Sequence, residues 1–261
     1  MTKKKLIFIK LGGSLITDKK RPYQVRNKTI ESLAKSIRRV VQELPHCRFI
    51  IGNGAGSFGH YAATQYDHRT PFGFAFIQQK VKVLNSILVD ALLENDVASI
   101  SFPFSAISTA NKSVVEKAFI DSLVGCLGNG MAPVVYGDVV YDSEQVSSIF
   151  STEKIFSILI DRLGDQYEIE RVIHLTNVDG FLDGRNIVVP RITNANYDLV
   201  KKHLYKTNGY DVTGGMFHKV EESMALAQKG IITNIANGEI DGVLERILLK
   251  NEKIGTEISS K

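Results

Sequence analysis

The chain has 261 residues, of which 44% are hydrophobic and 23% are charged, and 32 basic against 28 acidic residues give a net charge of +4. This composition excludes a disordered, collagenous or coiled-coil protein. The basic residues are scattered and no apolar run approaches about 18 residues, so we expect neither a nucleic-acid partner nor a membrane span. Cys47 and Cys126 have no CxxC spacing and are typical of reduced thiols in the cytoplasm.

Short apolar runs alternate along the chain with longer amphipathic stretches. The runs predict buried strands at residues 6–11, 48–52, 98–102, 132–136, 172–176 and 232–236. The stretches predict helices at 27–44, 78–95, 114–125, 152–163, 196–206, 215–229 and 237–249, and turn-rich segments predict hairpins at 136–146 and 179–191. This alternation favours an α/β fold with a largely parallel sheet covered on both faces. Since no linker is visible, we expect one domain of two lobes that meet near residue 150.

The first predicted strand ends in Lys10-Leu11-Gly12-Gly13-Ser14. In open α/β sheets ligands bind at the carboxyl ends of the strands, and paired glycines let backbone N–H groups approach an anion. A lysine inside a strand is costly unless it has a partner. Lys10 is therefore either a cation of a ligand site or a lysine that reaches the solvent at the sheet end. Lys19 is a candidate second cation at the same place.

The second predicted strand leads into a loop with Gly54, Gly56 and Gly59, which formally matches GxGxxG. This match is weak evidence for a dinucleotide site, because no acidic residue stands about 20 residues further on at the end of the next strand. A glycine loop before a helix is still suited to phosphate. His60 is then a candidate hydrogen-bond donor to a phosphate oxygen. The dipeptide Gly-Lys never occurs, which excludes a Walker A loop.

A third glycine pair, Gly214-Gly215, is expected to open a helix that carries Lys219 about one turn inside it, near the positive end of the helix dipole. Three glycine loops, each with a nearby cation, indicate a polyanion that extends across several strand ends. Phosphoryl transfer fits, because it depends mainly on positioning and charge neutralisation. His68, His174 and His203 have no matching partners, and we interpret them as solvated or structural.

Several segments form a set in fixed order: KLGGSLITDK at 10–19, GAGSFGH at 54–60, YGDV at 136–139, VDG at 178–180 and DVTGGM at 211–216. Together they resemble the amino acid kinase superfamily and, within it, the isopentenyl phosphate kinases; FGFAFIQQKVKVLNS at 72–86 and GTEI at 255–258 extend the resemblance. It implies an open αβα sandwich that forms a homodimer, with ATP and Mg²⁺ as cofactors and a small-molecule phosphate as substrate. The implied reaction converts isopentenyl phosphate to isopentenyl diphosphate, with a phosphoacceptor lobe at about 1–150 and a nucleotide lobe at 151–261.

The resemblance also implies roles for individual residues. The residues expected at the ATP phosphates are Lys10, Leu11, Gly12, Gly13, Ser14, Gly56, Gly215 and Lys219. The residues expected at the substrate phosphate are Ala55, His60 and Gly137. Lys19 would stabilise the charge on the transferred group, and the catalytic set is Lys10, Lys19, His60, Glu153 and Lys219.

The chain departs from the family pattern in three places. Asn53 stands where the family usually has histidine, and Asn177, still expected near ATP, replaces an aspartate. The motif SGDD is Ser-Thr-Glu-Lys at 151–154. In the family the first acid of this motif orients two active-site lysines, and Glu153 occupies its position. Lys154 reverses the second charge, and if it only faces solvent, restoring the acid there should be neutral or raise activity.

Two other functions remain open at this point. One is a kinase for another small phosphate or phosphonate, with fosfomycin kinases as the nearest relatives. An apolar cleft for an isoprenyl tail would distinguish the two, and Phe72, Phe74, Phe76 and Ile77 are the candidates for it, unless they are ordinary helix-core residues. The other is a nucleotide sensor without turnover, which the change at Lys154 favours and the retained lysines disfavour.

Overall fold

In residues 3–206 and 215–261, which the computed structural model describes, eight strands form a central sheet in the order β10-β12-β11-β9-β1-β2-β6-β3. Neighbouring strands are parallel except β11 and β12. The bounds are β1 (Lys4–Leu11), β2 (Cys47–Asn53), β3 (Ser99–Ser101), β6 (Ala132–Tyr136), β9 (Tyr167–Thr176), β10 (Arg191–Ile192), β11 (Ile232–Asn237) and β12 (Thr256–Ile258).

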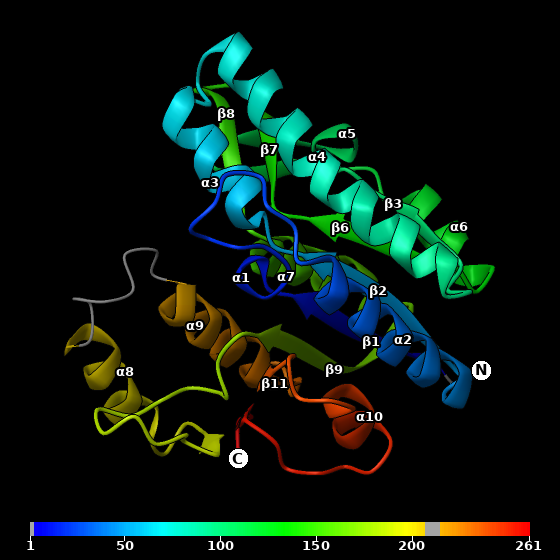
Figure 1. Cartoon of the computed structure of the whole chain (residues 1–261), viewed down its shortest axis with the longest axis vertical. Helices are drawn as coiled ribbons and strands as arrows, with labels where there is room; N and C mark the ends of the chain where they lie inside the picture. Colours follow the sequence, from blue (N-terminus) through cyan, green and yellow to red (C-terminus); the bar gives the residue numbers. More distant parts are fainter. Residues whose placement is uncertain (1–2, 207–214) are drawn as a thin grey trace.

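Helices cover both faces of this sheet, which confirms the expected α/β sandwich (Figure 1). One face packs against α2 (Asn27–Glu43), α4 (Pro71–Glu94) and α10 (Val243–Leu248). The other packs against α6 (Asp121–Gly128), α7 (Thr152–Leu163) and α9 (Gly215–Gln228). The remaining helices are α1 (Gly13–Ile16), α3 (Gly56–Gln65), α5 (Phe104–Ile107) and α8 (Tyr197–Lys206).

The central strand β1 explains why Lys10 is buried. Ile7 and Ile9 belong to the core under α2 and α10, whereas Phe8 belongs to the core under α7. Successive side chains of a strand point to opposite faces. Lys10 therefore shares the α7 face with Phe8, at the carboxyl end of the strand, and it is only 4% exposed.

A second, four-stranded sheet corrects the helix predicted at 114–125. Its order is β5-β4-β7-β8, with bounds β4 (Ser108–Asn111), β5 (Val114–Ala118), β7 (Asp138–Asp142) and β8 (Val146–Phe150). The chain reverses between β4 and β5 at Lys112 and Ser113, whose φ angles are 48° and 62°. The carboxylate of Asp142 accepts hydrogen bonds from both backbone N–H groups, at 3.1 Å and 2.7 Å. A residue far along the chain thus stabilises a hairpin that local periodicity does not predict.

The ends of other elements also differ from the predictions. Helix α4 begins at Pro71 rather than near residue 78, because Thr70 caps it and Pro71 suits the first turn. The last predicted helix, 237–249, is reduced to α10, which follows Gly242. The predicted hairpin 136–146 extends to Phe150 and forms part of the second sheet.

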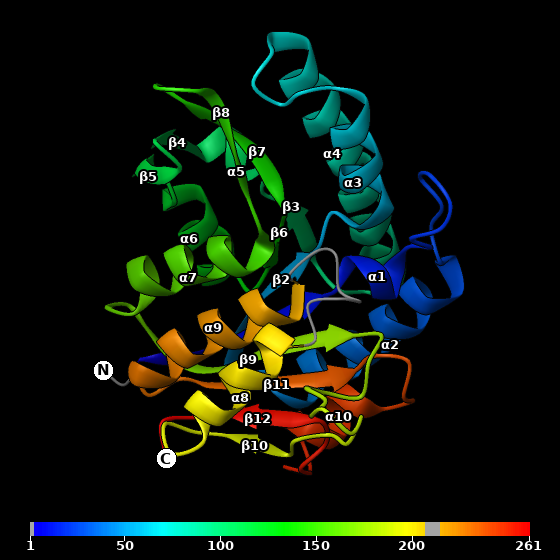
Figure 2. The ribbon, with the colours of Figure 1, turned by 90° about the vertical axis from the view of Figure 1, so that its left-hand side faces the viewer.

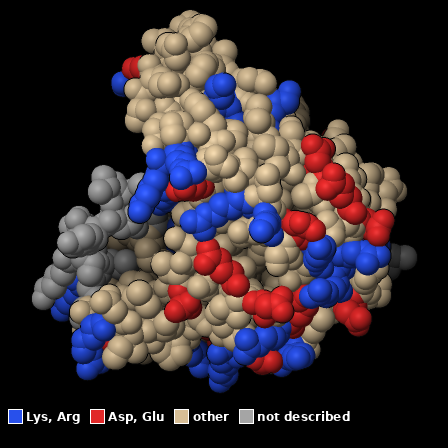
Figure 3. All heavy atoms as spheres, viewed as in Figure 1, with Lys and Arg blue, Asp and Glu red and all other residues tan. Residues whose placement is uncertain are grey.

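The arrangement around the carboxyl ends of β1 and β2 defines the site region. Figure 2 shows α3 and α4 rising on one side and β7 and β8 on the other, above these strand ends. On the face seen in Figure 3, basic and acidic side chains are mixed over the lower half, and the end formed by α3 and α4 is mostly uncharged. Within the described residues, no helix combines the length and apolar character needed to cross a membrane.

Candidate active site

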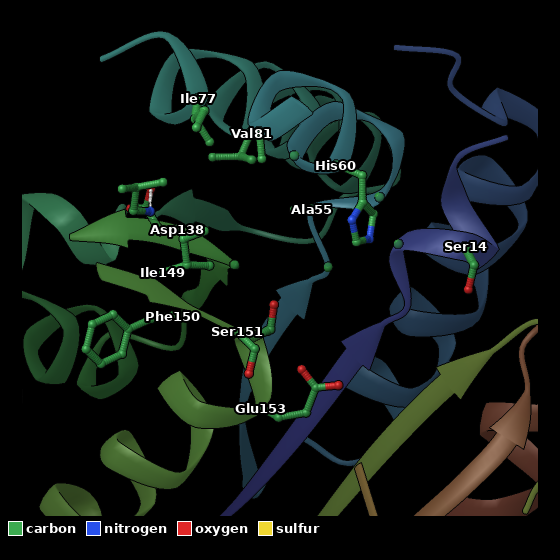
Figure 4. A pocket seen from close by; sticks show the side chains of 18 of the residues that line it. Ser14, Ala55, His60, Ile77, Val81, Asp138, Ile149, Phe150, Ser151 and Glu153 are labelled. Atoms are coloured by element: carbon green, nitrogen blue, oxygen red, sulfur yellow. Dashed lines mark hydrogen bonds between the residues drawn. The ribbon is translucent and has the colours of Figure 1, made fainter. Parts of the chain in front are cut away.

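A cavity of about 330 Å³ lies at these strand ends, between α3 and α4 on one side and β7, β8 and α7 on the other. The structure brings ten of the predicted site residues into its lining: Lys10, Gly13, Ser14, Lys19, Ala55, Gly56, His60, Gly137, Glu153 and Lys219. Figure 4 shows Ser14 and Glu153 toward one end, the apolar side chains Ile77, Val81 and Ile149 toward the other, and His60 between them. The cavity therefore has a polar end and an apolar end.

Glu153 lies between two lysines at the polar end. Its carboxylate accepts a hydrogen bond from the Lys10 ammonium, and the Lys219 Nζ lies 3.8 Å from the same oxygen. The side chains of Lys10, Glu153 and Lys219 are 6%, 9% and 17% exposed. A carboxylate between two ammonium groups reduces their repulsion and holds both in one geometry. This contact with both lysines is the one that the resemblance led us to expect of Glu153.

The start of α7 holds Glu153 in this place. The hydroxyl of Ser151 accepts a hydrogen bond from the Lys154 N–H and so caps the helix. The hydroxyl of Thr152 donates to the backbone carbonyl of Asn53 at 2.7 Å, which joins the helix start to the end of β2. Glu153 then lies in the first turn, where the helix dipole favours a negative charge.

The burial of this group perturbs its ionisation. Burial lowers the pKa of Lys10 to about 8; Glu153 opposes that shift and Lys219 adds to it. Burial raises the pKa of the Glu153 carboxyl, but the Lys10 and Lys219 charges outweigh burial, so this pKa lies below its ordinary value. At neutral pH the carboxylate is thus ionised. Lys10 is charged as well, but its pKa of about 8 lies only a little above that pH.

His174 is a buried neighbour of this charged group. It is the register partner of Lys10 on β9, it is 3% exposed, and its Nδ1 has no hydrogen-bond partner among the described residues. Burial and then Lys10 lower its pKa to about 3. The ring is therefore neutral. Since it is buried, the interpretation of His174 as a solvated histidine is wrong, and it is a structural one.

The two loops after β1 and β2 touch through glycines. A Cβ on Gly54 would lie 2.7 Å from the nitrogen of Gly13, and one on Gly13 would overlap the backbone of Gly56. Gly56 itself has a φ of 52° and lies against the Thr17 side chain. The Thr17 hydroxyl accepts a hydrogen bond from the Ser57 N–H at 2.9 Å. Backbone N–H groups of both loops can thus approach one polyanion closely.

His60 and Lys19 both line the cavity. His60 lies on α3, and Lys19 lies in a loop whose ends are joined by a bridge between Thr17 and Val25. Burial and then the Lys19 charge lower the pKa of His60, so the imidazole is neutral at pH 7. Ala55 and Gly137 lie beside each other there, since a Cβ on Gly137 would be 3.7 Å from the Ala55 nitrogen.

The apolar end differs from the prediction. Of the four candidates on α4, only Ile77 is among the described lining residues. Phe72 is 62% exposed; its ring stacks on Phe76 with centroids 6.1 Å apart and meets Tyr66 edge-on with centroids 4.9 Å apart, outside the cavity lining. The apolar lining is instead Ile77, Val81, Val139, Ile149 and Phe150. The signal for Val139 is its place directly after the YGD segment. Ile149 comes to the cavity only through the β7–β8 hairpin, and the Phe150 ring packs into the core beside Phe104.

Four predicted site residues lie outside the described lining: Leu11, Gly12, Asn177 and Gly215. The Leu11 side chain is fully buried in the core. Gly12 donates to the Leu175 carbonyl, and Asn177 accepts a hydrogen bond from the Ser14 hydroxyl at 2.9 Å. Gly215 begins α9, and the DVTGGM residues 211–214 lie outside the described residues.

The structure shows the contacts made by two of the residues that depart from the family pattern. Asn53 is fully buried and its side chain accepts a hydrogen bond from Asn85 at 2.9 Å, so it does not line the cavity. Lys154 does not simply face solvent: its ammonium donates to the Ser113 carbonyl at 2.6 Å. The expectation that an acid at position 154 leaves activity unchanged or raises it requires a lysine that only faces solvent. This condition is not met.

Comparison with known proteins agrees with this arrangement. A model of the amino acid kinase family matches residues 5–237. The chain is 36% identical to the isopentenyl phosphate kinase of Methanothermobacter thermautotrophicus, over 98% of this chain and 100% of that protein. It is 28% identical to that of Methanocaldococcus jannaschii, over 97% and 98%. A solved structure of isopentenyl phosphate kinase superposes with a TM-score of 0.80 at 32% identity, over 97% of this chain and 100% of the other. The chain belongs to the amino acid kinase family.

Proposed function

We propose that this protein is an isopentenyl phosphate kinase, which transfers the γ-phosphoryl group of ATP to isopentenyl phosphate. The observation that carries the proposal is one cavity with a lysine–carboxylate group at one end and an apolar lining at the other. Full-length relatives of this name support the same substrate pair. An apolar end suits an isoprenyl tail, and it would give a small polar acceptor little to contact.

In the proposed reaction an oxygen of the acceptor phosphate forms a bond to the γ-phosphorus of ATP. The bond from that phosphorus to the β–γ bridging oxygen breaks, and ADP leaves with the bond electrons. Lys10 and Lys219 neutralise charge on the transferred group, and Glu153 keeps both aimed. Lys19 supplies further positive charge, and the neutral His60 ring donates a hydrogen bond to the acceptor phosphate.

Mg²⁺ enters this proposal only as the counter-ion of ATP. Among the described residues, no group of three or more His, Cys, Asp or Glu side chains is placed to hold a metal ion. The two carboxylates among the described lining residues are already engaged, Glu153 by lysines and Asp138 by backbone N–H groups of Ser105 and Val139. Proteins often leave most Mg²⁺ ligands to substrate phosphates and water.

The remaining parts of the proposal concern organisation. We place the acceptor in the lobe of residues 1–150 and the nucleotide in that of residues 151–261. We also propose a cytoplasmic homodimer. The free cysteines Cys47 and Cys126 support a reducing compartment, and the family resemblance supports the dimer. Sedimentation of the purified protein tests its mass.

The alternatives lose their support at particular residues. The nucleotide-sensor hypothesis depends on the altered tetrad, yet Glu153 still contacts both lysines. The fosfomycin-type hypothesis requires a cavity without an extended apolar end. No observation therefore favours either alternative over an isoprenyl acceptor.

A coupled assay of ADP release tests the proposal with isopentenyl phosphate, dimethylallyl phosphate and fosfomycin as acceptors. We expect kcat/KM to be highest for isopentenyl phosphate. Ile77→Asp, which places a charge at the apolar end, should raise the acceptor KM and leave the ATP KM nearly unchanged. Turnover of fosfomycin above both isoprenoid phosphates, or no ADP release with any acceptor, would refute the proposed function.

A further inference from the structure

A hydrogen-bonded pair joins the two walls of the cavity, the helix wall of α3 and α4 and the strand wall of β7 and β8. His68 lies in the connection between α3 and α4, and Ser147 is the second residue of β8. The Ser147 hydroxyl donates to the backbone carbonyl of His68 and lies 2.9 Å from Nδ1 of the His68 ring. Ser147 is fully buried. We call these two contacts the clasp.

Both contacts of the clasp pass through one oxygen atom. A serine hydroxyl has a single hydrogen, and Ser147 donates it to the His68 carbonyl. The same oxygen therefore accepts a hydrogen bond from the His68 ring, whose Nδ1 carries a hydrogen. Removing this oxygen breaks both contacts, whereas removing the ring breaks one.

On the strand wall, the clasp shares a face with the apolar lining. Ser147 and Ile149 are two residues apart on β8, and side chains at that spacing point to the same face of a strand. Ile149 lines the cavity, whereas Phe150 packs into the core on the other face. β8 runs toward the start of α7, where Glu153 lies at the polar end. Ser147 is therefore farther from the polar end than Ile149, by about 7 Å of extended strand.

On the helix wall, His68 also lies beyond the lining residues. α3 begins at Gly56, beside the polar end, and both His60 and Ala63 on this helix line the cavity. His68 follows after the end of α3, and α4 then returns along the wall with Ile77 in the lining. Figure 2 shows the connection between the two helices at the top of this wall, away from the ends of β1 and β2. The clasp thus lies at the outer end of the cavity, past its apolar lining.

Local hydrogen bonds hold each side of the clasp in shape. In the α3–α4 connection, the Asp67 carbonyl accepts hydrogen bonds from the N–H and the hydroxyl of Thr70, at 3.0 Å and 2.9 Å. The Asp67 carboxylate accepts another from the Arg69 N–H at 2.9 Å. In the hairpin, the Ser148 hydroxyl donates to the buried Asp142 carboxylate at 2.6 Å. The clasp hydrogen bonds must therefore break before the two sides can separate here.

We infer that His68 and Ser147 are specificity-determining residues: their clasp closes the outer end of the acceptor cavity and disfavours acceptors whose tail extends past Ile149. This inference rests on the proposed function for the identity of the acceptor. A short tail ends before the clasp and leaves it intact, whereas a longer tail binds only to molecules in which the clasp is open. The affinity for the longer tail is then reduced by the fraction of molecules that are open. Two hydrogen bonds make this reduction about ten- to a hundredfold.

The test measures dissociation constants by calorimetry for isopentenyl phosphate and for geranyl phosphate, whose tail is one isoprene unit longer. Ser147→Ala removes the oxygen that makes both contacts. We expect it to bind geranyl phosphate about ten- to a hundredfold more tightly than the unsubstituted protein does. The dissociation constant for isopentenyl phosphate should change by less than about threefold. His68→Ala, which keeps the carbonyl and removes the ring, is the second variant and should shift the preference in the same direction.

Ser143→Ala is the matched control for this test. Ser143 belongs to the same hairpin, and its hydroxyl accepts a hydrogen bond from Asn111 on β4 at 2.9 Å, so its contact does not join the two walls. This variant should bind both phosphates like the unsubstituted protein.

Amide hydrogen exchange reports the opening of the clasp without any ligand. In Ser147→Ala the amides of residues 66–70 should exchange faster, and those of β1 should exchange as before. An unchanged ratio of the two dissociation constants, equal gains for both phosphates, or unchanged exchange at residues 66–70 would overturn the inference.

The same samples keep the two proposals distinguishable. Turnover of isopentenyl phosphate by the unsubstituted protein tests the proposed function alone, and the ratio of dissociation constants tests the clasp. Binding without turnover refutes the kinase and leaves the ratio meaningful. No binding of either phosphate to any of the variants would overturn both.

Discussion

Replacing Glu153 by glutamine removes the negative charge that lies between Lys10 and Lys219 while keeping the size of the side chain. Glutamine can still accept a hydrogen bond from Lys10, so the change isolates the charge. The two lysines, 6% and 17% exposed, would then face each other's charge without compensation. We expect Lys10 to lose its proton at pH 7 in this variant.

The magnitude follows from the geometry. A Lys10 pKa of about 8 means that about 1.4 kcal/mol keeps the ammonium charged at pH 7. An ion pair ~4 Å apart, at an effective dielectric constant of about 20, contributes about 4 kcal/mol, and Lys10 is hydrogen-bonded to Glu153. The lost attraction exceeds the margin, so the pKa of Lys10 falls below 7. Loss of one preorganised charge at the transferred group lowers turnover about a hundredfold.

The assay is kcat/KM for ATP as a function of pH, which reports the ionisation of the free enzyme. A reaction that needs the ammonium form declines as pH rises through the lysine's pKa. In the unsubstituted enzyme we expect the midpoint of this decline at about pH 8. In Glu153→Gln we expect the midpoint below pH 7, so that the variant regains part of its activity when the solution is acidified. Glu153→Asp keeps the charge and should keep the position of the decline, with lower turnover because the carboxylate is one methylene shorter.

Glu222→Gln is the matched control, because Glu222 on α9 bonds Ser157 and is not among the described lining residues. It should leave the pH profile unchanged. The reasoning is refuted if Glu153→Gln declines at the same pH as the unsubstituted enzyme, or if its turnover at pH 7 is unaltered. Retained turnover would mean that another acid orients the lysines.

Three further variants test other parts of the site. His60→Ala should lower kcat/KM for the acceptor about ten- to a hundredfold, because a hydrogen bond to a charged group is lost, and an unchanged value would make the residue structural. Lys19→Met should lower kcat about a hundredfold with a nearly constant KM for ATP, as expected for a contact made mostly in the transition state; a rise in that KM instead would indicate ground-state binding. Gly56→Ala should lower the melting temperature by several degrees, because a φ of 52° and the nearby Thr17 side chain oppose a Cβ. Gly125→Ala, whose Cβ would meet nothing within 4 Å, should not, and equal melting temperatures would count against the strain.

The fold is predictable from sequence where burial alone decides structure. Strands such as β1 and β9 contain runs of Ile, Val, Leu and Phe because both faces are covered, and these runs are visible without tertiary information. The segment Val114–Ala118 is not predictable in this way. Its pairing depends on Asp142, about 30 residues later, which binds the turn at Lys112 and Ser113.

Part of the candidate site is predictable from the sequence, and part depends on contacts between distant segments. Glycine loops and lysines at strand ends are readable because their position in the fold follows from chain order. The place of Ile149 is not readable, because nothing in the local sequence shows which face of β8 turns toward the cavity and which, with Phe150, turns toward the core. The choice of α4 aromatics for the tail cleft is wrong for the complementary reason: Phe72 and Phe76 lie on a helix that does line the cavity, but on another side of it.

The contact of Gly13 with Gly54 and Gly56 has a thermodynamic consequence. Because the two loops meet backbone to backbone, neither can be displaced without moving the other. A ligand that orders the loop after β1 also restricts the loop after β2, so the entropy lost on ordering is shared between the two binding events. Each ligand should then raise the affinity of the other by the same factor, since linkage between two binding equilibria is reciprocal. Because glycine has no side chain, the backbones of the two loops touch, and this contact couples the occupancy of one loop to that of the other.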